Sequence, residues 1–375
     1  MHLAFVSQYD PDDLSAYSGI PHFMVRALRQ RVDRLSVVAP LATGNRVAGR
    51  VAKLRHQLRG EGYSRQHTPA AARALSAAAA ARLRDLRPDA VLTPSTLPLY
   101  ALDVDCPTAC WPDATFEANL LFYPGFSTLT DAHVAEAHAV ERRALSNATL
   151  ALFAAQYAAD SASGYYGIDE GAVHVVPYGA NLDPVPDDVE AGLAARPPGE
   201  CRLLFVGSGW VRKGGDVALR VAEEMTAAGL PTTLTVAGPA PPVGAHPLLR
   251  ATGFLRKGVP AERDRLRRLF AESHALCMPV RAEDYGCVFA EAAAFGLPSV
   301  ATRVGGVPSA VADGESGLLV PPRARPQDIA ARLLALLADA GAYRQLCRSA
   351  RGWYERVGNW AAAADRAVAL IEGAR

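Results

Sequence analysis

The chain has 375 residues and a formal net charge of +1, and 50% of its residues are hydrophobic. This length is too great for one ordinary core and fits two domains of roughly 100 to 200 residues each. The apolar fraction argues against a disordered chain, and the balanced charge argues against nucleic acid as the main partner. The six cysteines form no paired Cys-x-x-Cys motifs, so we expect reduced thiols and a cytoplasmic location.

The first half of the chain alternates short β-type runs with longer helical stretches. Residues 1–7 are largely apolar, but acidic residues follow at once, so we expect a buried strand there and no signal peptide. The alternation predicts βαβ units and a parallel sheet. The expected strands are residues 3–7, 36–39, 90–93, 108–111, 150–153 and 173–177. Because no run of about 18 apolar residues occurs, we expect at most peripheral contact with a membrane.

Two loops in this half follow expected strands and carry candidate ligand contacts. Gly19 lies between the first strand and a helix that begins near His22. Such a junction is common in βα units, so Gly19 belongs either to a ligand-binding loop or to an ordinary turn. Asp113 follows the fourth strand, where it can accept a hydrogen bond from a ligand hydroxyl or cap the next helix.

Other charged segments of the first half carry weaker signals. Residues 46–65 contain six Arg or Lys against one acid, which fits contact with an anionic acceptor, a membrane surface or only solvent. Asp103 and Asp105 have the spacing of a metal-binding Asp-x-Asp motif but precede a strand, so we predict no metal site there. His133 and His138 lack the spacing of a zinc-binding helical pair.

A stretch rich in Pro, Asp and Glu, residues 183–200, is expected to link two domains. The strand and helix rhythm restarts after it, with expected strands at residues 202–206, 234–237, 251–254, 275–279, 299–302 and 317–320. We therefore predict an α/β protein of two Rossmann-like domains, residues 1–182 and 201–357. A terminal segment, residues 358–375, carries an amphipathic helix that either caps its own domain or packs back on the first.

Two loops of the second half are candidates for binding a nucleotide. Arg212 and Lys213 lie in a glycine-rich loop between a buried strand and a helix, which suits phosphate binding, although both side chains can equally be solvated. Phe254 and Leu255 follow another strand, where they are either ligand contacts or a plain strand exit.

The most informative segment joins an apolar strand to an apolar helix through an acidic loop. Glu283 lies in this loop, and the helix begins near Gly286. The first amides of the helix, around Gly286, Cys287 and Val288, can therefore bind a diphosphate. Glu291 lies further along the same helix, so the two carboxylates can contact different parts of one extended ligand. Taken separately, Glu283 can cap the helix and Glu291 can lie on a solvated face.

These segments resemble the donor-site signature of the family 4 retaining glycosyltransferases, within glycosyltransferase group 1, which have the GT-B fold. The signature is Glu-x7-Glu followed by a Gly-Gly turn, and Glu283, Glu291 and the pair Gly305 and Gly306 match it. The resemblance covers nearly the whole chain, but only its C-terminal half is specific. It implies two Rossmann-like domains that face each other across a cleft.

The resemblance implies a role for each matched residue. It assigns contact with the donor sugar to Glu283, the ribose hydroxyls to Glu291 and neutralisation of the diphosphate to Lys213. Many members of the family have an Arg directly after the strand's Gly, where this chain has Ser208. Either Arg212 supplies the second cation, which we favour, or the diphosphate is held with one fewer charge. The remaining donor-binding residues are expected to be Gly19, Phe254, Leu255, Tyr285, Gly286, Cys287 and Val288.

The resemblance also implies an activity. Asp113 lies where many members place a His that contacts the donor sugar, so it would accept a hydrogen bond there. The implied reaction moves a sugar from a nucleotide diphosphate sugar to a hydroxyl of a glycan, lipid or secondary metabolite, with retention and without a metal or other cofactor. The alternatives are a sugar-nucleotide epimerase and a non-catalytic sugar-nucleotide-binding protein. The Ala- and Arg-rich composition suggests a bacterial source, while the nucleobase, sugar and acceptor are not specified by the sequence.

Overall fold

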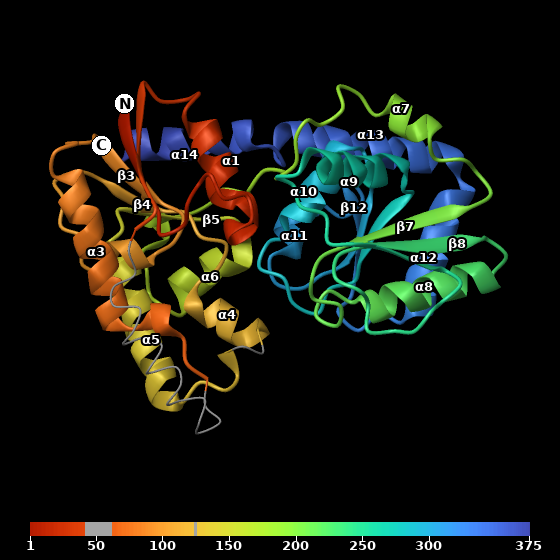
Figure 1. The fold of residues 1–375 in the computed structure, drawn as a ribbon, viewed down its shortest axis with the longest axis horizontal. Coiled ribbons are helices and arrows are strands. Elements are labelled where there is room, and N and C mark those ends of the chain that lie inside the picture. Colours follow the sequence, from red (N-terminus) through yellow and green to blue (C-terminus); the bar gives the residue numbers. More distant parts are fainter. Residues whose placement is uncertain (42–61, 124–125) are drawn as a thin grey trace. The chain divides into compact units, whose positions relative to one another are not determined.

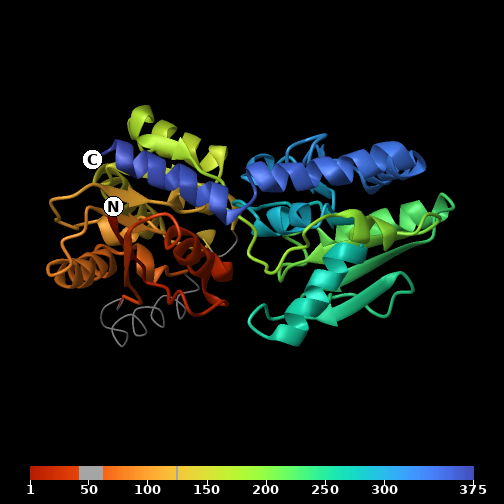
Figure 2. The ribbon, with the colours of Figure 1, turned by 90° about the horizontal axis from the view of Figure 1, so that it is seen from above.

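The computed structural model describes residues 1–41, 62–123 and 126–375. The chain divides into two compact units, of which the first comprises Met1–Pro177 and Ala363–Arg375 and the second comprises Tyr178–Ala362. Figures 1 and 2 show each unit in two perpendicular views. The domain limits expected from the sequence, residues 1–182, 183–200, 201–357 and 358–375, stay predictions.

The described residues of the first unit form a parallel sheet with the strand order β2-β1-β3-β4-β5-β6. Its strands are β1 (His2–Val6), β2 (Arg34–Val38), β3 (Ala90–Thr93), β4 (Thr108–Cys110), β5 (Leu150–Phe153) and β6 (Val173–Val175). Every residue of β3 and β5 is buried, as expected for central parallel strands covered by helices on both faces. All six strands expected in this half are confirmed.

Besides α14 (Trp360–Gly373), five α-helices are described in the first unit, and they lie on both faces of this sheet (Figure 2). They are α1 (Ile20–Leu28), α3 (Pro69–Leu83), α4 (Phe116–Phe122), α5 (Asp131–Ser146) and α6 (Gln156–Gly164). Three of them begin after a threonine whose hydroxyl oxygen accepts a backbone N–H of the first turn, namely Thr68, Thr115 and Thr130. Such caps satisfy amide groups that the helix itself leaves without partners.

The second unit repeats the architecture with the strand order β12-β11-β10-β7-β8-β9, again parallel. Its strands are β7 (Cys201–Val206), β8 (Thr232–Ala237), β9 (Leu249–Gly253), β10 (Ala275–Met278), β11 (Ser299–Thr302) and β12 (Gly317–Val320). Its helices are α7 (Glu190–Ala194), α8 (Gly215–Ala227), α9 (Pro260–Glu272), α10 (Cys287–Ala294), α11 (Val307–Ala310), α12 (Pro326–Ala338) and α13 (Ala340–Arg356). In Figure 1, α8 and α12 cover one face of the sheet and α9, α10 and α13 the other.

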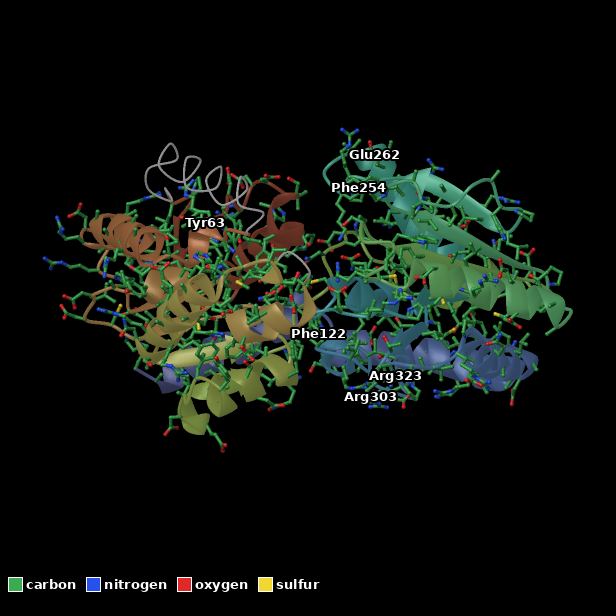
Figure 3. The ribbon with its side chains drawn as sticks, turned by 90° about the horizontal axis from the view of Figure 1, so that it is seen from below. Tyr63, Phe122, Phe254, Glu262, Arg303 and Arg323 are labelled. Atoms are coloured by element: carbon green, nitrogen blue, oxygen red, sulfur yellow. The ribbon has the colours of Figure 1, made fainter. Side chains whose placement is uncertain are left out.

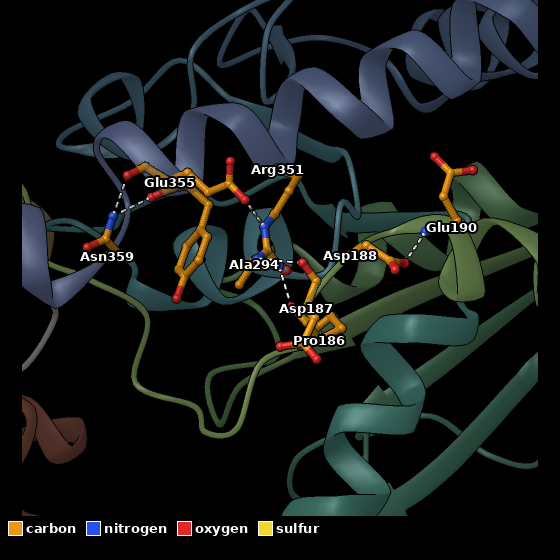
Figure 4. Close-up of polar contacts among 9 residues, drawn as sticks. Pro186, Asp187, Asp188, Glu190, Ala294, Arg351, Glu355 and Asn359 are labelled. Atoms are coloured by element: carbon orange, nitrogen blue, oxygen red, sulfur yellow. Dashed lines mark hydrogen bonds and ion pairs between the residues drawn. The ribbon is translucent and has the colours of Figure 1, made fainter.

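The stretch expected to be a linker, residues 183–200, lies within the second unit and carries α7. Arg351 of α13 holds it in place, because Nη1 of Arg351 donates to the carbonyl oxygen of Pro186 at 2.7 Å and to that of Ala294 at 2.8 Å (Figure 4). These bonds fasten the stretch to the C-terminal end of α10.

The last helix, α14 (Trp360–Gly373), contributes to both units. In the second unit, Nε1 of Trp360 donates to Oδ1 of Asn181 at 2.8 Å. In the first unit, Nε of Arg31 donates to Oδ1 of Asp365 at 3.0 Å. Among the helices described, none combines the length and the apolar character needed to cross a bilayer.

Candidate functional site

The ligand site of the second unit is expected at the carboxyl ends of its two central strands, β7 and β10. The chain proceeds from β7 through β8 to β9 on one side and returns to β10 on the other side of β7. In open α/β sheets, ligands bind at the carboxyl ends of the strands where the order reverses in this way. The loops that leave β7 and β10 carry the predicted residues Arg212, Lys213 and Glu283.

The structure brings these three side chains together. Nζ of Lys213 donates to Oε2 of Glu283 at 2.8 Å, and Nη1 of Arg212 lies 3.3 Å from the same oxygen. Nη1 of Arg212 also donates to the carbonyl oxygen of Ala282 at 2.7 Å. Glu283 is therefore the shared partner of both predicted cations, and Arg212 lies where it can supply the second positive charge.

Glu283 is held in its charged form although it is only 8% exposed. Burial by itself would raise the pKa of this carboxyl group, but Lys213 and Arg212 outweigh burial and hold the pKa below its usual range. An ionised carboxylate and two cations thus lie together at the carboxyl end of the sheet. The net positive charge of this group suits a ligand that carries phosphate.

A glycine allows the two loops to approach each other. Gly214 has φ +77°, and a Cβ built there would lie 2.0 Å from the carbonyl oxygen of Pro279. The backbone N–H of Arg281 donates to the carbonyl oxygen of Arg212 at 2.7 Å. A larger residue than glycine at position 214 would force these loops apart.

The acidic loop turns into α10 at another glycine. Gly286 is the N-cap residue with φ +84°, and a Cβ there would lie 2.8 Å from the ring of Phe289 and 3.1 Å from Cγ of Glu283. The predicted anion site at the amides of Cys287 and Val288 is therefore placed beside Glu283. The N-terminus of a helix favours anions because its first N–H groups have no partners within the helix.

The Gly-Gly turn packs against the same loop. The backbone N–H of Gly306 donates to the carbonyl oxygen of Glu283 at 3.0 Å. Gly305 adopts φ +53° just after β11. The turn therefore supports the backbone of the acidic loop from the neighbouring strand.

Glu291 lies in α10 with its side chain 2% exposed, and Nζ of Lys257 donates to its Oε1. Lys257 comes from the loop after β9, the loop that also carries Phe254 and Leu255. Phe254 is 64% exposed, and Figure 3 shows it at the same edge of the second unit as Glu262. The predicted nucleotide loop is thus connected to the second predicted carboxylate.

Tyr285 is buried within the second unit. Its hydroxyl donates to the carbonyl oxygen of Tyr178 at 2.8 Å, and the two rings pack edge to face. The side chain therefore positions the acidic loop on the unit's own backbone. Its assignment as a donor-binding residue stays a prediction.

The first unit gathers its own polar loop at the carboxyl ends of β1 and β4. Tyr17, Ser18 and Gly19 adopt φ +48°, +58° and +82° in succession. The Tyr17 hydroxyl donates to Oδ1 of Asp113 at 2.5 Å and accepts the backbone N–H of Asp113 at 3.3 Å. The ring of Tyr9 stacks on that of Tyr17 with 5.1 Å between centroids. The loop that carries Gly19 and the loop that carries Asp113, predicted separately, are therefore joined through Tyr17.

Comparison with known proteins identifies the family of the second unit. Residues 200–339 match the family model described as Glycosyl transferases group 1. This stretch is a glycosyl transferases group 1 domain. The resemblance predicted from Glu283, Glu291 and the Gly-Gly turn is thereby confirmed.

The relatives of this group 1 domain include two bacterial enzymes named D-inositol 3-phosphate glycosyltransferase. The protein of Streptomyces bingchenggensis is 35% identical over 234 residues, which are 58% of this chain and 51% of the relative. That of Catenulispora acidiphila is 37% identical over 171 residues, which are 41% of this chain and 40% of the relative. The chain thus spans about half the length of the first of these relatives.

Solved structures share the fold along the whole chain. Sucrose-phosphate synthase from Thermosynechococcus elongatus has a TM-score of 0.70 at 16% identity, with 100% of this chain and 99% of that chain covered. HepE of Anabaena in complex with UDP has a TM-score of 0.66 at 15% identity, with 100% of both chains covered. The predicted GT-B fold of two parallel α/β sheets is therefore confirmed.

The sequence did not reveal every polar residue that contacts a predicted site residue. Lys257 and Tyr17 make the contacts described above, and neither belongs to a recognisable motif. An acid placed on a helix with apolar neighbours, as Glu291 is, would have indicated that some cation must approach it. Most of the basic stretch predicted at residues 46–65 lies outside the described residues.

Proposed function

We propose that the chain is a retaining glycosyltransferase that moves a sugar from a nucleoside diphosphate sugar to a hydroxyl group of an acceptor. The observation that carries this proposal is the buried, ionised Glu283 that shares Lys213 and Arg212 at the switch point of the second sheet. The amides that open α10 lie beside it. Cations and amides together suit the diphosphate, and the carboxylate suits the hydroxyl groups of a sugar.

The similar proteins support a nucleotide sugar as the donor. The curated relatives are named for glycosyl transfer to D-inositol 3-phosphate, and one structural neighbour was solved in complex with UDP-glucose. We take from them the class of donor, a nucleoside diphosphate sugar, and the class of acceptor, a hydroxyl group.

The residues of this chain would act mainly on the leaving group. The bond between the anomeric carbon and the diphosphate oxygen breaks, and both electrons stay on that oxygen. Lys213, Arg212 and the α10 amides stabilise the charge that develops there, so the proposed site needs no metal ion. The acceptor oxygen forms the new bond on the same face, and its proton passes to the departing phosphate oxygen.

Ligand binding and turnover test this proposal together. The thermal midpoint would be measured with UDP, GDP and ADP, because a ligand at 100 times its Kd adds about 2.7 kcal/mol to stability. Release of the nucleotide from the matching nucleotide sugar would then be measured with candidate acceptors, and the anomeric configuration of the product would be read by NMR. A sugar-nucleotide epimerase would change the sugar without transferring it.

Two variants make the test specific to the site. We expect Lys213→Ala to weaken nucleotide binding and turnover, while Arg220→Ala, which removes an exposed cation of α8, leaves both unchanged. If Lys213→Ala and Glu283→Ala both retained wild-type affinity and turnover, the proposed function would be wrong. Inversion at the anomeric carbon would refute retention alone.

A further inference from the structure

The pair formed by Lys257 and Glu291 is unusual for its surroundings. The carboxylate of Glu291 is 2% exposed, whereas Lys257 is 24% exposed and reaches it from another loop. The residues that flank Glu291 in α10 are Ala290 and Ala292, both buried. A charge in such a place is costly unless a partner of opposite charge is bound to it.

Stability alone is a weak reason for such a pair. Buried ion pairs can often be replaced by apolar residues of similar volume with little loss of stability, because both charges give up water. Glu291 also lies beyond the first turn of α10, so the unpaired amides at the start of the helix contribute little to it. The position of the pair, beside the predicted nucleotide loop, offers a functional reason.

The loop that carries Lys257 is held at two adjacent residues. Arg256 binds Glu262 of α9 through its backbone N–H at 2.6 Å and through its guanidinium group. Lys257 binds Glu291 of α10. The exposed Phe254 lies between these two anchoring residues and β9. The ion pair of Lys257 and Glu291 therefore connects the Phe254 loop to α10, whose first amides form the predicted diphosphate site.

We propose that Lys257 is a positioning residue that orients Glu291 toward the ribose hydroxyls of a nucleoside diphosphate. Lys257 binds one carboxylate oxygen, Oε1, and thereby fixes the rotation of the carboxylate that presents Oε2. It also holds the Phe254 loop at the same end of the ligand. This inference rests on the proposed function, since it concerns the same nucleotide.

The test compares ligands with and without ribose hydroxyls. The Kd of Lys257→Met would be measured for whichever of UDP, GDP and ADP binds the wild type best, and for its 2′,3′-dideoxy counterpart. We expect about tenfold weaker binding of the ribonucleotide, the size expected for a lost charged hydrogen bond. The dideoxynucleotide should bind the variant and the wild type within about twofold, because the hydroxyls that Glu291 would contact are missing.

Matched variants separate orientation from charge and from folding. Arg256→Met removes a positive charge from the neighbouring residue of the same loop. We expect any change that it makes in Kd to be the same for the ribonucleotide and the dideoxynucleotide. Lys257→Arg should recover most of the affinity. The Glu291→Gln side chain is neutral and needs no counter-charge, so this variant should fold even if Lys257→Met does not. Like Lys257→Met, it should bind the ribonucleotide more weakly and leave binding of the dideoxynucleotide unchanged.

The outcomes are distinct. Equal losses for both nucleotides would show that Lys257 acts on the phosphates or on the fold, and would overturn the proposal, as would no loss at all. A ribose-independent effect of Glu291→Gln would overturn it as well. If the wild type bound none of the three nucleotides, the proposed function itself would fail.

Discussion

Each unit places polar loops at the carboxyl ends of its parallel strands, but the two units build these loops differently. In the second unit, the loops that leave β7 and β10 adopt positive φ at Gly207, Gly214 and Gly286. In the first unit, Tyr17 and Ser18 adopt positive φ although neither is glycine. Left-handed backbone costs a residue with a side chain roughly 1 to 2 kcal/mol, so the first loop stores strain that the second avoids.

The loops also differ in what joins them. In the second unit, ion pairs connect Glu283 to Lys213 and Arg212. In the first unit, the hydroxyl group of Tyr17 donates a hydrogen bond to Asp113. Backbone strain persists only where the surroundings hold it, and it gathers at ligand sites. The contrast teaches that the second unit joins its loops through charged groups, whereas the first unit joins them through a hydroxyl group and a strained backbone.

Replacing one carboxylate in each loop should show most clearly how far the two loops differ in their importance for turnover. We expect Glu283→Gln to lower kcat/KM by roughly 10² to 10³, because the variant can neither balance its two cations nor accept as strongly from the sugar. Asp113→Asn should lower it by about tenfold, since the Tyr17 hydroxyl can still donate to the amide oxygen. The measurement is nucleotide release at saturating acceptor, and an equal or larger effect at Asp113 would contradict the predicted ranking of the two loops.

The close approach of the loops in the second unit can be tested through stability. Gly214 and Gly314 both have φ +77°, but a Cβ at Gly314 meets nothing within 4 Å, whereas at Gly214 it meets Pro279 at 2.0 Å. Gly314→Ala should cost about 1 to 2 kcal/mol through φ alone. Gly214→Ala should cost about 3 kcal/mol or more because the backbone must also move. Urea unfolding measures both, and equal losses would mean that the contact with Pro279 does not matter.

Buried carboxylates of the two units should respond oppositely to pH. Burial raises the pKa of Glu141 in α5 to about 7, although its hydrogen bond from the Thr96 hydroxyl at 2.6 Å lowers it in part. Because the pKa is raised from its usual value of 4.5, the contribution of Glu141 to stability is fully present below pH 4.5 and is lost as pH rises through about 7. The pKa of Glu283 is lowered, so its contribution to stability is present above its usual pKa and is lost as pH falls below that range.

Glu141→Gln isolates this effect, because the amide stays neutral. Between about pH 5 and about pH 8, the wild type should lose on the order of 2 kcal/mol of unfolding free energy relative to the variant. Glu136→Gln, at an exposed position of the same helix, is the control and should follow the wild type. The prediction fails if the two stability curves of wild type and Glu141→Gln run parallel over this range.

The strands were predictable because central parallel strands are continuous apolar runs. Residues 90–93 and 150–153 were predicted to the residue, as β3 and β5. At β9 the prediction of 251–254 is shifted, because the strand spans Leu249–Gly253 and is exposed along much of its length. An edge strand has a neighbouring strand on one side only and is less buried, so its sequence carries a weaker apolar pattern.

The site was predictable where topology alone brings residues together. Loops that leave adjacent parallel strands meet at one edge, so Lys213 and Glu283 could be paired from their positions after β7 and β10. The identity of the cation that approaches Glu291 depends on how far the Lys257 side chain reaches from its loop to α10, which leaves no local trace in the sequence. The strained backbone at Tyr17 likewise could not be predicted, because nothing in its sequence requires positive φ.

The smallest expected effect concerns that strain. Ser18 is exposed and has φ +58°, so Ser18→Gly should raise the free energy of unfolding by up to about 1 kcal/mol, the relief of strain less the added flexibility of glycine. Ser18→Ala is the matched variant, because it removes the hydroxyl but keeps the Cβ and should not stabilise the protein. If Ser18→Gly gains stability and loses turnover while Ser18→Ala keeps turnover, the strained conformation itself serves the site. If Ser18→Gly gains no stability, the first loop carries no strain at this residue, and the difference between the units reduces to their charges.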